Sequence, residues 1–191
     1  VFPLIKQNKV WLGPSITSGD RKFNVPDDYP LNAATCGVDE DGKKYIRVKG
    51  VRWFTNLDYK ERHEDLIMYK PYRPSEYPKF DNFDAINVDK TENIPFDYDG
   101  VMGVPVTFLD KWNPDQFEIV GITKSWFGIA SKIYGEQIQV DKNGMESKVT
   151  KLNDAASLEV QKPPLDRTYY KVNGKIYIAT YPRILIRKIK K

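Results

Sequence analysis

The segment 71–103 constrains the fold of this chain more than any other part of the sequence. It contains Pro71, Pro74, Pro78 and Pro95, interleaved with many tyrosines and phenylalanines. Each proline removes a backbone N–H donor and fixes φ, so a long helix or strand cannot form here. The aromatic residues argue against disorder, because disordered segments contain few of them. We therefore predict an extended but packed loop with short strands and turns.

The rest of the chain predicts many short strands and few helices. Strands are expected at residues 9–12, 22–25, 45–56, 104–109 and 117–120, of which 45–56 is the strongest prediction. Hairpin turns are expected at residues 39–43, 141–144 and 172–175, which contain Asp-Gly or Asn-Gly pairs. Helical expectations are limited to residues 2–8, a polar turn or helix in 58–66, a helix start with Asn113 as N-cap, and a short helix in 125–134. The expected class is strand-rich, α/β to α+β.

Composition limits the cellular setting and the kinds of site. The 191-residue chain, 40% hydrophobic and 29% charged, has the composition of a globular protein with one domain or two small ones. No run of about 18 apolar residues is present, so a membrane-spanning helix is not expected. The single cysteine, Cys36, cannot form an internal disulfide, in keeping with a cytoplasmic protein. One cysteine and one histidine, His63, are too few for a zinc site, and no metal site is predicted.

The net charge of +4 is mildly basic and unevenly distributed. Residues 81–99 are acidic, whereas residues 181–191 carry five basic side chains and no acidic one. Phosphate contacts and plain solvation of a charged tail both explain this terminal segment. The candidates for DNA-phosphate contacts are Arg52, Lys60, Arg62, Lys111, Arg183 and Arg187, with Lys79, Lys124, Lys132 and Arg167 as weaker ones.

An aromatic pair next to polar groups is the clearest binding signal. Trp53 and Phe54 follow Arg52, and Asn56 comes two residues later, at the end of the expected strand. Aromatic rings can stack on bases, and an amide can bond to a base edge. We take Trp53, Phe54 and Asn56 as candidates for contact with the target base. The competing interpretation places one of the two rings in the core, since alternation directs one inward and one outward.

The acidic loop allows a different function. Magnesium-dependent nucleases need two or three carboxylates that converge with a lysine. The carboxylates available for such a site are Asp81, Asp84, Asp89, Asp97 and Asp99. Their spacing permits a nuclease site without singling it out, because solvation of a loop explains the same residues.

Four stretches carry a resemblance to a known family: residues 53–57, 77–90, 95–105 and 106–121. They resemble the C-terminal half of EcoRI-type adenine-specific DNA methyltransferases. The match is close over residues 1–121 and looser at residues 173–177 and 183–186. Enzymes of this kind hold the target amine with an Asn-Pro-Pro-aromatic tetrapeptide. The nearest string here, Asn113-Pro114-Asp115-Gln116, lacks the second proline and the ring.

The resemblance implies that this chain is a C-terminal piece of a site-specific adenine-N6 methyltransferase of a restriction–modification system. It implies duplex DNA as one partner and the N-terminal half as the other, with no membrane. Residues 1–70 would supply the last helix and strands of a Rossmann-like core, and residues 71–191 a family-specific region with a role in target recognition. The resemblance also implies that S-adenosylmethionine binds the N-terminal half. The glycines at 100, 103, 121 and 128 form no cofactor loop, so we do not expect this chain alone to bind the cofactor.

On this interpretation the piece holds no catalytic residue and is inactive alone. Two alternatives remain open from the residues. One is a non-catalytic module in which the loop 71–103 packs against another domain. The other is the metal-dependent nuclease.

Overall fold

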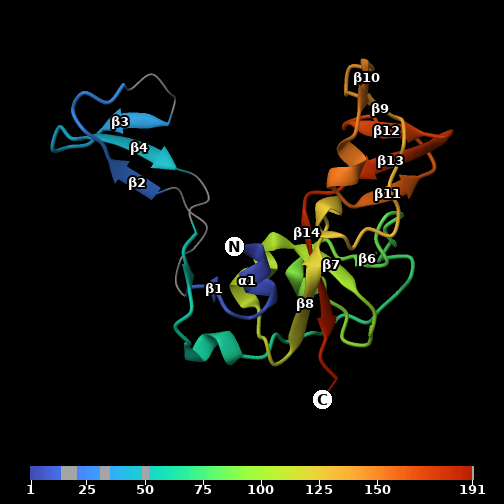
Figure 1. Ribbon diagram of the computed structural model, residues 1–191, viewed down its shortest axis with the longest axis horizontal. Coiled ribbons are helices and arrows are strands. Elements are labelled where there is room, and N and C mark those ends of the chain that lie inside the picture. The colour runs from blue at the N-terminus through green and yellow to red at the C-terminus, as the bar shows by residue number, and fades with distance from the viewer. Residues whose placement is uncertain (14–20, 31–34, 49–51, 191) are drawn as a thin grey trace.

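The computed structural model describes residues 1–13, 21–30, 35–48 and 52–190 (Figure 1). The described residues form four β-sheets, several 3-10 turns and the short helix α1 (Phe2–Lys6). The strand-rich α+β class is thus confirmed, and α1 matches the helix expected at residues 2–8. No helix within the described ranges has the length and apolar character needed to cross a membrane.

A four-stranded sheet lies at the centre of the molecule. Its order is β6 (Ile86–Asn87), β7 (Met102–Pro105), β14 (Arg183–Lys188) and β8 (Phe117–Ile122). The β6–β7 pair is parallel and the other two pairs are antiparallel. Strand β8 confirms the buried strand expected at residues 117–120.

Strand β14 is buried on both faces. Ile184 and Ile186 belong to the core cluster that contains Phe117 and Ile5, so α1 packs on this sheet. Leu185 points to the other face, into a second cluster with Phe83. Burial on both sides explains why β14 has consecutive apolar residues rather than alternation.

A five-stranded antiparallel sheet packs above the first in Figure 1. Its order is β10 (Glu146–Val149), β9 (Gln137–Val140), β12 (Tyr169–Val172), β13 (Lys175–Ala179) and β11 (Ser157–Val160). The β12–β13 hairpin has Asn173 at φ 49° and Gly174 at φ 76°, the left-handed pair of a type I′ turn. Both hairpins predicted in this half, at residues 141–144 and 172–175, are confirmed.

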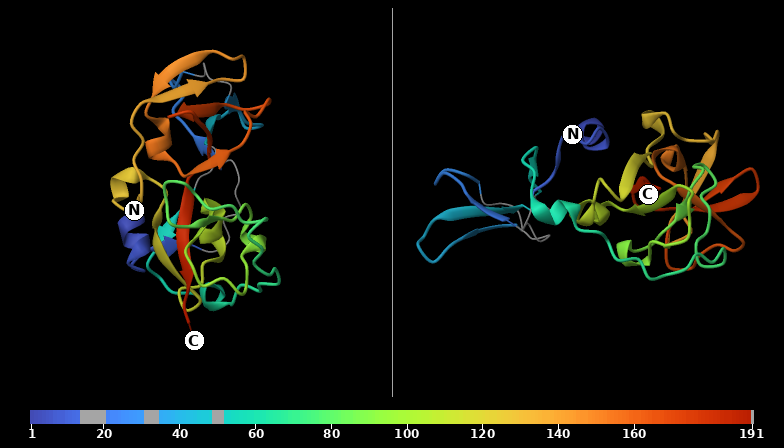
Figure 2. Two further views of the ribbon diagram at one scale, coloured as in Figure 1. Left: turned by 90° about the vertical axis from the view of Figure 1, so that its right-hand side faces the viewer. Right: turned by 90° about the horizontal axis from the view of Figure 1, so that it is seen from below.

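The N-terminal strands form two smaller sheets. Strand β2 (Arg21–Asn24) pairs with β4 (Lys44–Val48), which pairs with β3 (Cys36–Val38). This three-stranded sheet stands apart from the rest of the protein in Figure 1 and in the right-hand view of Figure 2. Strand β1 (Trp11–Leu12) pairs only with β5 (Phe54–Thr55) within the described residues.

The strand predicted at residues 45–56 is therefore wrong as one element. Its two ends, β4 and β5, belong to different sheets. Residues 49–51 of the predicted strand lie outside the described residues. The short strands predicted at 9–12 and 22–25 are confirmed as β1 and β2, and the turn at 39–43 joins β3 to β4.

The loop 71–103 is extended and packed, as predicted. Its aromatic residues Tyr77, Phe80 and Phe83 are buried, and its strand residues are those of the two-residue strand β6 and the first two residues of β7. A 3-10 turn, η2 (Thr91–Asn93), is its helical element. A Cβ at Gly103 would lie 2.6 Å from the Phe80 ring, so the glycine lets loop and strand β7 approach closely.

Three other predictions differ from the structure. Strand β7 ends at Pro105, and residues expected to extend it form the 3-10 helix η3 (Val106–Lys111). Asn113 starts a turn and no helix follows it. The helix expected at 125–134 is only the 3-10 turn η4 (Ser125–Phe127), which ends at Gly128 with φ +72°. The polar segment 58–66 contains the 3-10 helix η1 (Lys60–His63).

The described residues contain no parallel strand pair bridged by an α-helix. A Rossmann-like core in residues 1–70 therefore stays a prediction, and so does the division of the chain at residue 70. Packing crosses that position, because Ile5 and Trp11 contact the cluster that contains Ile186.

Candidate nucleic-acid interface

The predicted base-contact residues Trp53, Phe54 and Asn56 lie at the short β1–β5 pair. Trp53 and Phe54 are both about 40% exposed, although alternation predicted one ring inside and one outside. The reason is that a two-stranded sheet has little core to bury either ring. The Trp53 ring packs instead on Gly13, where a Cβ would lie 2.0 Å from it. Asn56 is exposed. All three side chains stay candidates.

Three predicted phosphate contacts lie in the same half of the molecule. Lys60 is exposed on η1. Arg52 pairs with Asp110 at 3.2 Å, and Lys111 is the next residue. Lys111 lines a depression of about 500 Å³ together with Asp110, Asp89, Glu92 and one further lysine, Lys90. Three carboxylates and two lysines give this depression the wrong sign for a phosphate.

Arg62 differs from the expected phosphate contact, because the protein's own groups enclose its side chain. The residue is 7% exposed. Its guanidinium lies 3.6 Å from the Trp11 ring centroid and 5.5 Å from that of Trp112. It also donates to the carboxylate of Asp58 at 3.2 Å and to the side-chain oxygen of Asn8. Arg62 therefore joins η1 to β1 and the core.

The basic C-terminal segment is a strand whose charges have partners. Arg183 donates to the side-chain oxygen of Asn87 at 3.2 Å and lies 3.5 Å from Asp89. Burial lowers the pKa of Arg183, and Asp89 opposes this shift. Arg187 pairs with Glu118 at 3.2 Å. The four basic residues of 183–190 thus each lie beside an acid from elsewhere in the fold, since Lys188 and Lys190 both pair with Asp99.

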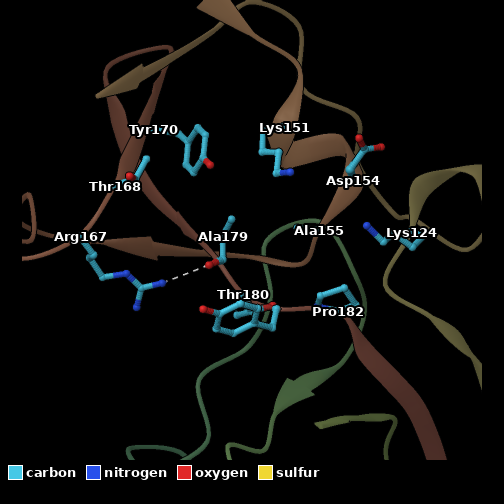
Figure 3. Close-up of a pocket in the computed structure, with 11 residues that line it drawn as sticks. Lys124, Lys151, Asp154, Ala155, Arg167, Thr168, Tyr170, Ala179, Thr180 and Pro182 are labelled. Carbon is cyan, nitrogen blue, oxygen red and sulfur yellow. Dashed lines mark hydrogen bonds between the residues drawn. The ribbon is translucent and has the colours of Figure 1, made fainter. Parts of the chain in front are cut away.

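A different group of cations converges on an open cleft of about 640 Å³ (Figure 3). Lys151 and Lys124 extend into the opening from one side, and Arg167 stands on the other. None of the three makes an ion pair within the described part of the chain. Arg167 donates to the backbone carbonyl of Ala179 at 3.1 Å. The sequence had suggested Lys124 and Arg167 separately; Lys151 was missed, since only folding brings the three together.

The cleft lies where the two large sheets join. Lys124 follows β8, and Lys151 begins the 3-10 helix η5 (Lys151–Asp154). Arg167 precedes β12, and the linker from β13 to β14 completes the lining. Among the residues that line it, Asp154 is the one carboxylate. The charged side chains of the lining therefore sum to +2, from three cations and one anion.

The wall that carries Lys151 is held by a buried amide. Asn82, 1% exposed, donates to the carbonyls of Leu152 (3.2 Å) and Ala155 (2.8 Å). Its side-chain oxygen accepts from the N–H of Ser157 at 2.9 Å and from the Ser157 hydroxyl at 3.0 Å. Two of these bonds hold the end of η5 and the other two hold the start of β11 (Ser157–Val160) against the loop 71–103, so this wall of the cleft is fixed by the protein itself.

Two tyrosines flank the cations. Tyr170 is buried in β12, and burial raises the pKa of its hydroxyl, which keeps it protonated. Tyr181, in the linker, is 86% exposed. The cleft thus combines positive charge, a neutral hydroxyl and an open aromatic ring.

The tetrapeptide that begins at Asn113 stabilises the fold through its side-chain hydrogen bonds. The Asn113 side chain accepts from the N–H of Asp115 at 2.8 Å and donates to His63 and Asp65 at 3.1 and 3.0 Å. With 1% exposure and these bonds made, the amide is not presented to a substrate. His63 closes the same turn, with Nδ1 2.7 Å from Asp115 and Nε2 3.0 Å from Asp58.

The carboxylates considered for a nuclease bind separate partners. Asp81 lies 2.5 Å from Lys132 and 2.6 Å from the hydroxyl of Tyr134. Asp99 pairs with Lys190 at 3.1 Å. Within the described ranges, no three acidic, histidine or cysteine side chains are grouped as a metal site would require. The geometry gives the nuclease alternative no support.

Comparison with known proteins assigns the chain to a class. A family model described as adenine-specific methyltransferase EcoRI matches residues 1–189. The chain is 49% identical over 126 residues to the type II methyltransferase M.EcoRI of Escherichia coli, covering 65% of this chain and 39% of that protein. It is 42% identical over 124 residues to the type II methyltransferase M.MgeORF184P of Mycoplasma genitalium, covering 63% and 39%. No solved structure gives a significant match.

The chain thus belongs to the family described as adenine-specific methyltransferase EcoRI, since the family model covers nearly the whole chain. The resemblance seen in the sequence is confirmed. The match spans about two fifths of the length of the curated relatives.

Proposed function

We propose that this chain is the DNA-contacting part of a type II adenine-N6 DNA methyltransferase of a restriction–modification system. The observation that carries the proposal is the family match over residues 1–189. The relatives named above are type II methyltransferases, and the chain aligns with 39% of their length. On this proposal the rest of the enzyme binds S-adenosylmethionine and performs the transfer in the cytoplasm.

Among the described residues, two of the glycines considered for a cofactor loop have surroundings that support S-adenosylmethionine binding outside this chain. A cofactor loop needs glycines at a strand-to-helix turn, where the backbone can approach the ligand. Gly103 and Gly121 lie inside or beside strand pairs, and a Cβ on them would meet Phe80 at 2.6 Å and Ile129 at 2.2 Å. These glycines serve packing. The engaged Asn113 side chain likewise supports a division of labour in which catalysis lies outside this chain.

Target recognition would use the surface around β1 and β5. The exposed rings of Trp53 and Phe54, with the amide of Asn56, supply stacking and base-edge chemistry. Among the described strands, β1 and β5 pair only with each other, which leaves one edge of each strand unpaired. Such edges favour addition to a larger sheet, which agrees with a Rossmann-like core completed by the rest of the enzyme.

The three-stranded sheet supports a second contact with the rest of the enzyme. Phe23, Val38 and Val48 lie on one face, by the β2–β4–β3 register, around Ile46. They are 45%, 54% and 41% exposed. A sheet of three short strands gains stability when its apolar face is covered. We propose that the remaining part of the methyltransferase covers it.

Two measurements on the full 191-residue chain test the proposal. Fluorescence anisotropy with a labelled DNA duplex should show binding at 50 mM salt that weakens at least tenfold at 200 mM, because phosphate contacts release counterions. Isothermal titration with S-adenosylmethionine should show no binding. Tight cofactor binding would contradict the division of labour. Absence of DNA binding at low salt would leave the protein-interaction module as the better explanation.

A further inference from the structure

We propose that the cleft of Lys124, Lys151 and Arg167 binds one nucleotide unit of an unpaired nucleic-acid strand. The phosphate would lie against the three cations and the base against the ring of Tyr181. This inference rests on the proposed function, because it assigns one DNA contact to a surface that the family match leaves open.

Charge is the first argument. Most cations near the large sheets are paired with an acid, as Lys132 is with Asp81 and Lys171 is with Glu146 at 2.6 Å. Lys124, Lys151 and Arg167 instead share one opening with a single carboxylate. Like charges around a concave surface repel one another and concentrate the positive potential. A bound phosphate relieves this repulsion and displaces its counterions.

Size is the second argument. A cleft of about 640 Å³ lies within the range of about 300–1,000 Å³ typical of small-ligand sites. The cleft is open to solvent, with Lys124 and Arg167 on opposite sides of it (Figure 3), so a chain of nucleotides can enter and leave it. The bonds of Asn82 hold the Lys151 wall in place before any ligand arrives.

Stacking is the third argument, and it selects an unpaired nucleotide. At 86% exposure the Tyr181 ring offers an open face beside the cations. A base inside a duplex has both faces covered by its neighbours, whereas an unpaired base can stack on an aromatic ring. The protonated hydroxyl of Tyr170 and the hydroxyl of Thr168 lie in the same lining and can bond to sugar or phosphate oxygens.

The principal test compares two charge-matched double variants of the full chain. Lys124→Glu/Lys151→Glu changes the cleft. Lys142→Glu/Lys162→Glu changes two lysines of the same half that do not line the cleft. Anisotropy with a labelled single-stranded 12-mer should show a loss of about 30-fold for the cleft variant and less than threefold for the control. Equal losses would overturn the proposal, and circular dichroism confirms that both variants fold.

The stacking part is tested at Tyr181. Tyr181→Ala should weaken 12-mer binding about tenfold, because the stacking of one base on the aromatic ring is lost. Tyr181→Phe should keep wild-type affinity. Both variants should bind inorganic phosphate like the wild type. An unchanged affinity of Tyr181→Ala for the 12-mer would overturn the assignment of the base.

Separate ligands identify the source of the phosphate. If the ligand is a single nucleic-acid strand, the 12-mer should bind more tightly than AMP. AMP should compete with the 12-mer for the wild type and not for the cleft variant. AMP binding as tight as that of the 12-mer would overturn the strand assignment. If duplex DNA binds the wild type but the single-stranded 12-mer binds the wild type and both double variants equally, this inference fails and the proposed function stands. If no DNA binds the wild type, the proposed function fails.

Discussion

Two groups of cations in this protein have opposite surroundings. Arg62 and Arg183 are largely buried, and each is bonded to an amide oxygen and near a carboxylate. Lys124 and Lys151 line an open cleft in which no acid pairs with them among the described residues. The sequence alone ranked the first group higher, because Arg62 lies near the aromatic pair and Arg183 in a basic tail. A cation's partners in the fold, and not its neighbours in sequence, therefore decide whether it is available to a ligand.

The largest effect is expected at Asn82, which supports the cleft without touching a ligand. Asn82→Ala leaves the carbonyls of Leu152 and Ala155 and the N–H of Ser157 without their partner. Each buried unsatisfied group costs about 1–3 kcal/mol, so we expect a loss of about 3 kcal/mol in the free energy of unfolding. Urea denaturation measures it. A loss below 0.5 kcal/mol, judged against the threshold for surface changes, would contradict a preformed wall.

A substitution at Arg62 tests the group of cations that are bound by the protein's own side chains. Arg62→Ala removes the cation over Trp11 and its bonds to Asp58 and Asn8, which should cost about 2 kcal/mol of stability. DNA affinity under conditions where the variant is folded should stay within twofold of wild type. Lys60→Ala, an exposed neighbour, is the matched control and should leave stability unchanged. A stable Arg62→Ala protein with weakened DNA binding would reverse the assignment.

A smaller effect separates Lys151 from Lys111. Lys151→Ala should reduce the slope of log affinity for the single-stranded 12-mer against log salt concentration by about 1, because one phosphate contact is lost. Lys111→Ala should leave the slope unchanged, because Asp89, Glu92 and Asp110 surround that lysine. Anisotropy titrations at four salt concentrations give both slopes. The opposite pattern would place the phosphate track on the Lys111 side.

The smallest effect concerns pH and His63. Two hydrogen bonds raise the pKa of this histidine. The bond to Asp115 has the larger effect and the bond to Asp58 the smaller one. The stabilisation from the protonated histidine is therefore fully present below its pKa in the unfolded state, about 6.5. It is lost as pH rises through the higher pKa of the folded state. The midpoint of thermal unfolding should fall slightly over that range in the wild type. His63→Gln should show no such fall, and an identical pH profile in both would exclude the contribution.

Local patterns predicted much of this fold because local chemistry determines it. The Asn-Gly pair at 173–174 requires left-handed backbone, and it forms the expected hairpin. The prolines of 71–103 exclude a long helix or strand, whatever surface the loop packs against. Alternation in 117–120 matches a strand with one buried face.

The failures of sequence reasoning arise from tertiary contacts. Residues 45–56 read as one strand, but β4 and β5 pair in different sheets. Asn113 has the sequence of a helix cap, yet its side chain bonds to His63 and Asp65, about 50 positions away. The cleft could not be predicted, because Lys124, Lys151 and Arg167 come from three separate segments that carry no common motif. Their convergence depends on how two sheets join.

The most direct measurement is a map of the nucleic-acid contact by amide chemical shifts. The isotope-labelled full chain would be titrated with the single-stranded 12-mer at low salt. We expect shifts grouped at Lys124, Lys151, Arg167 and Tyr181, with Arg62 and Lys111 unaffected. Shifts confined to Arg62 and Lys111, with the cleft unchanged, would contradict this expectation.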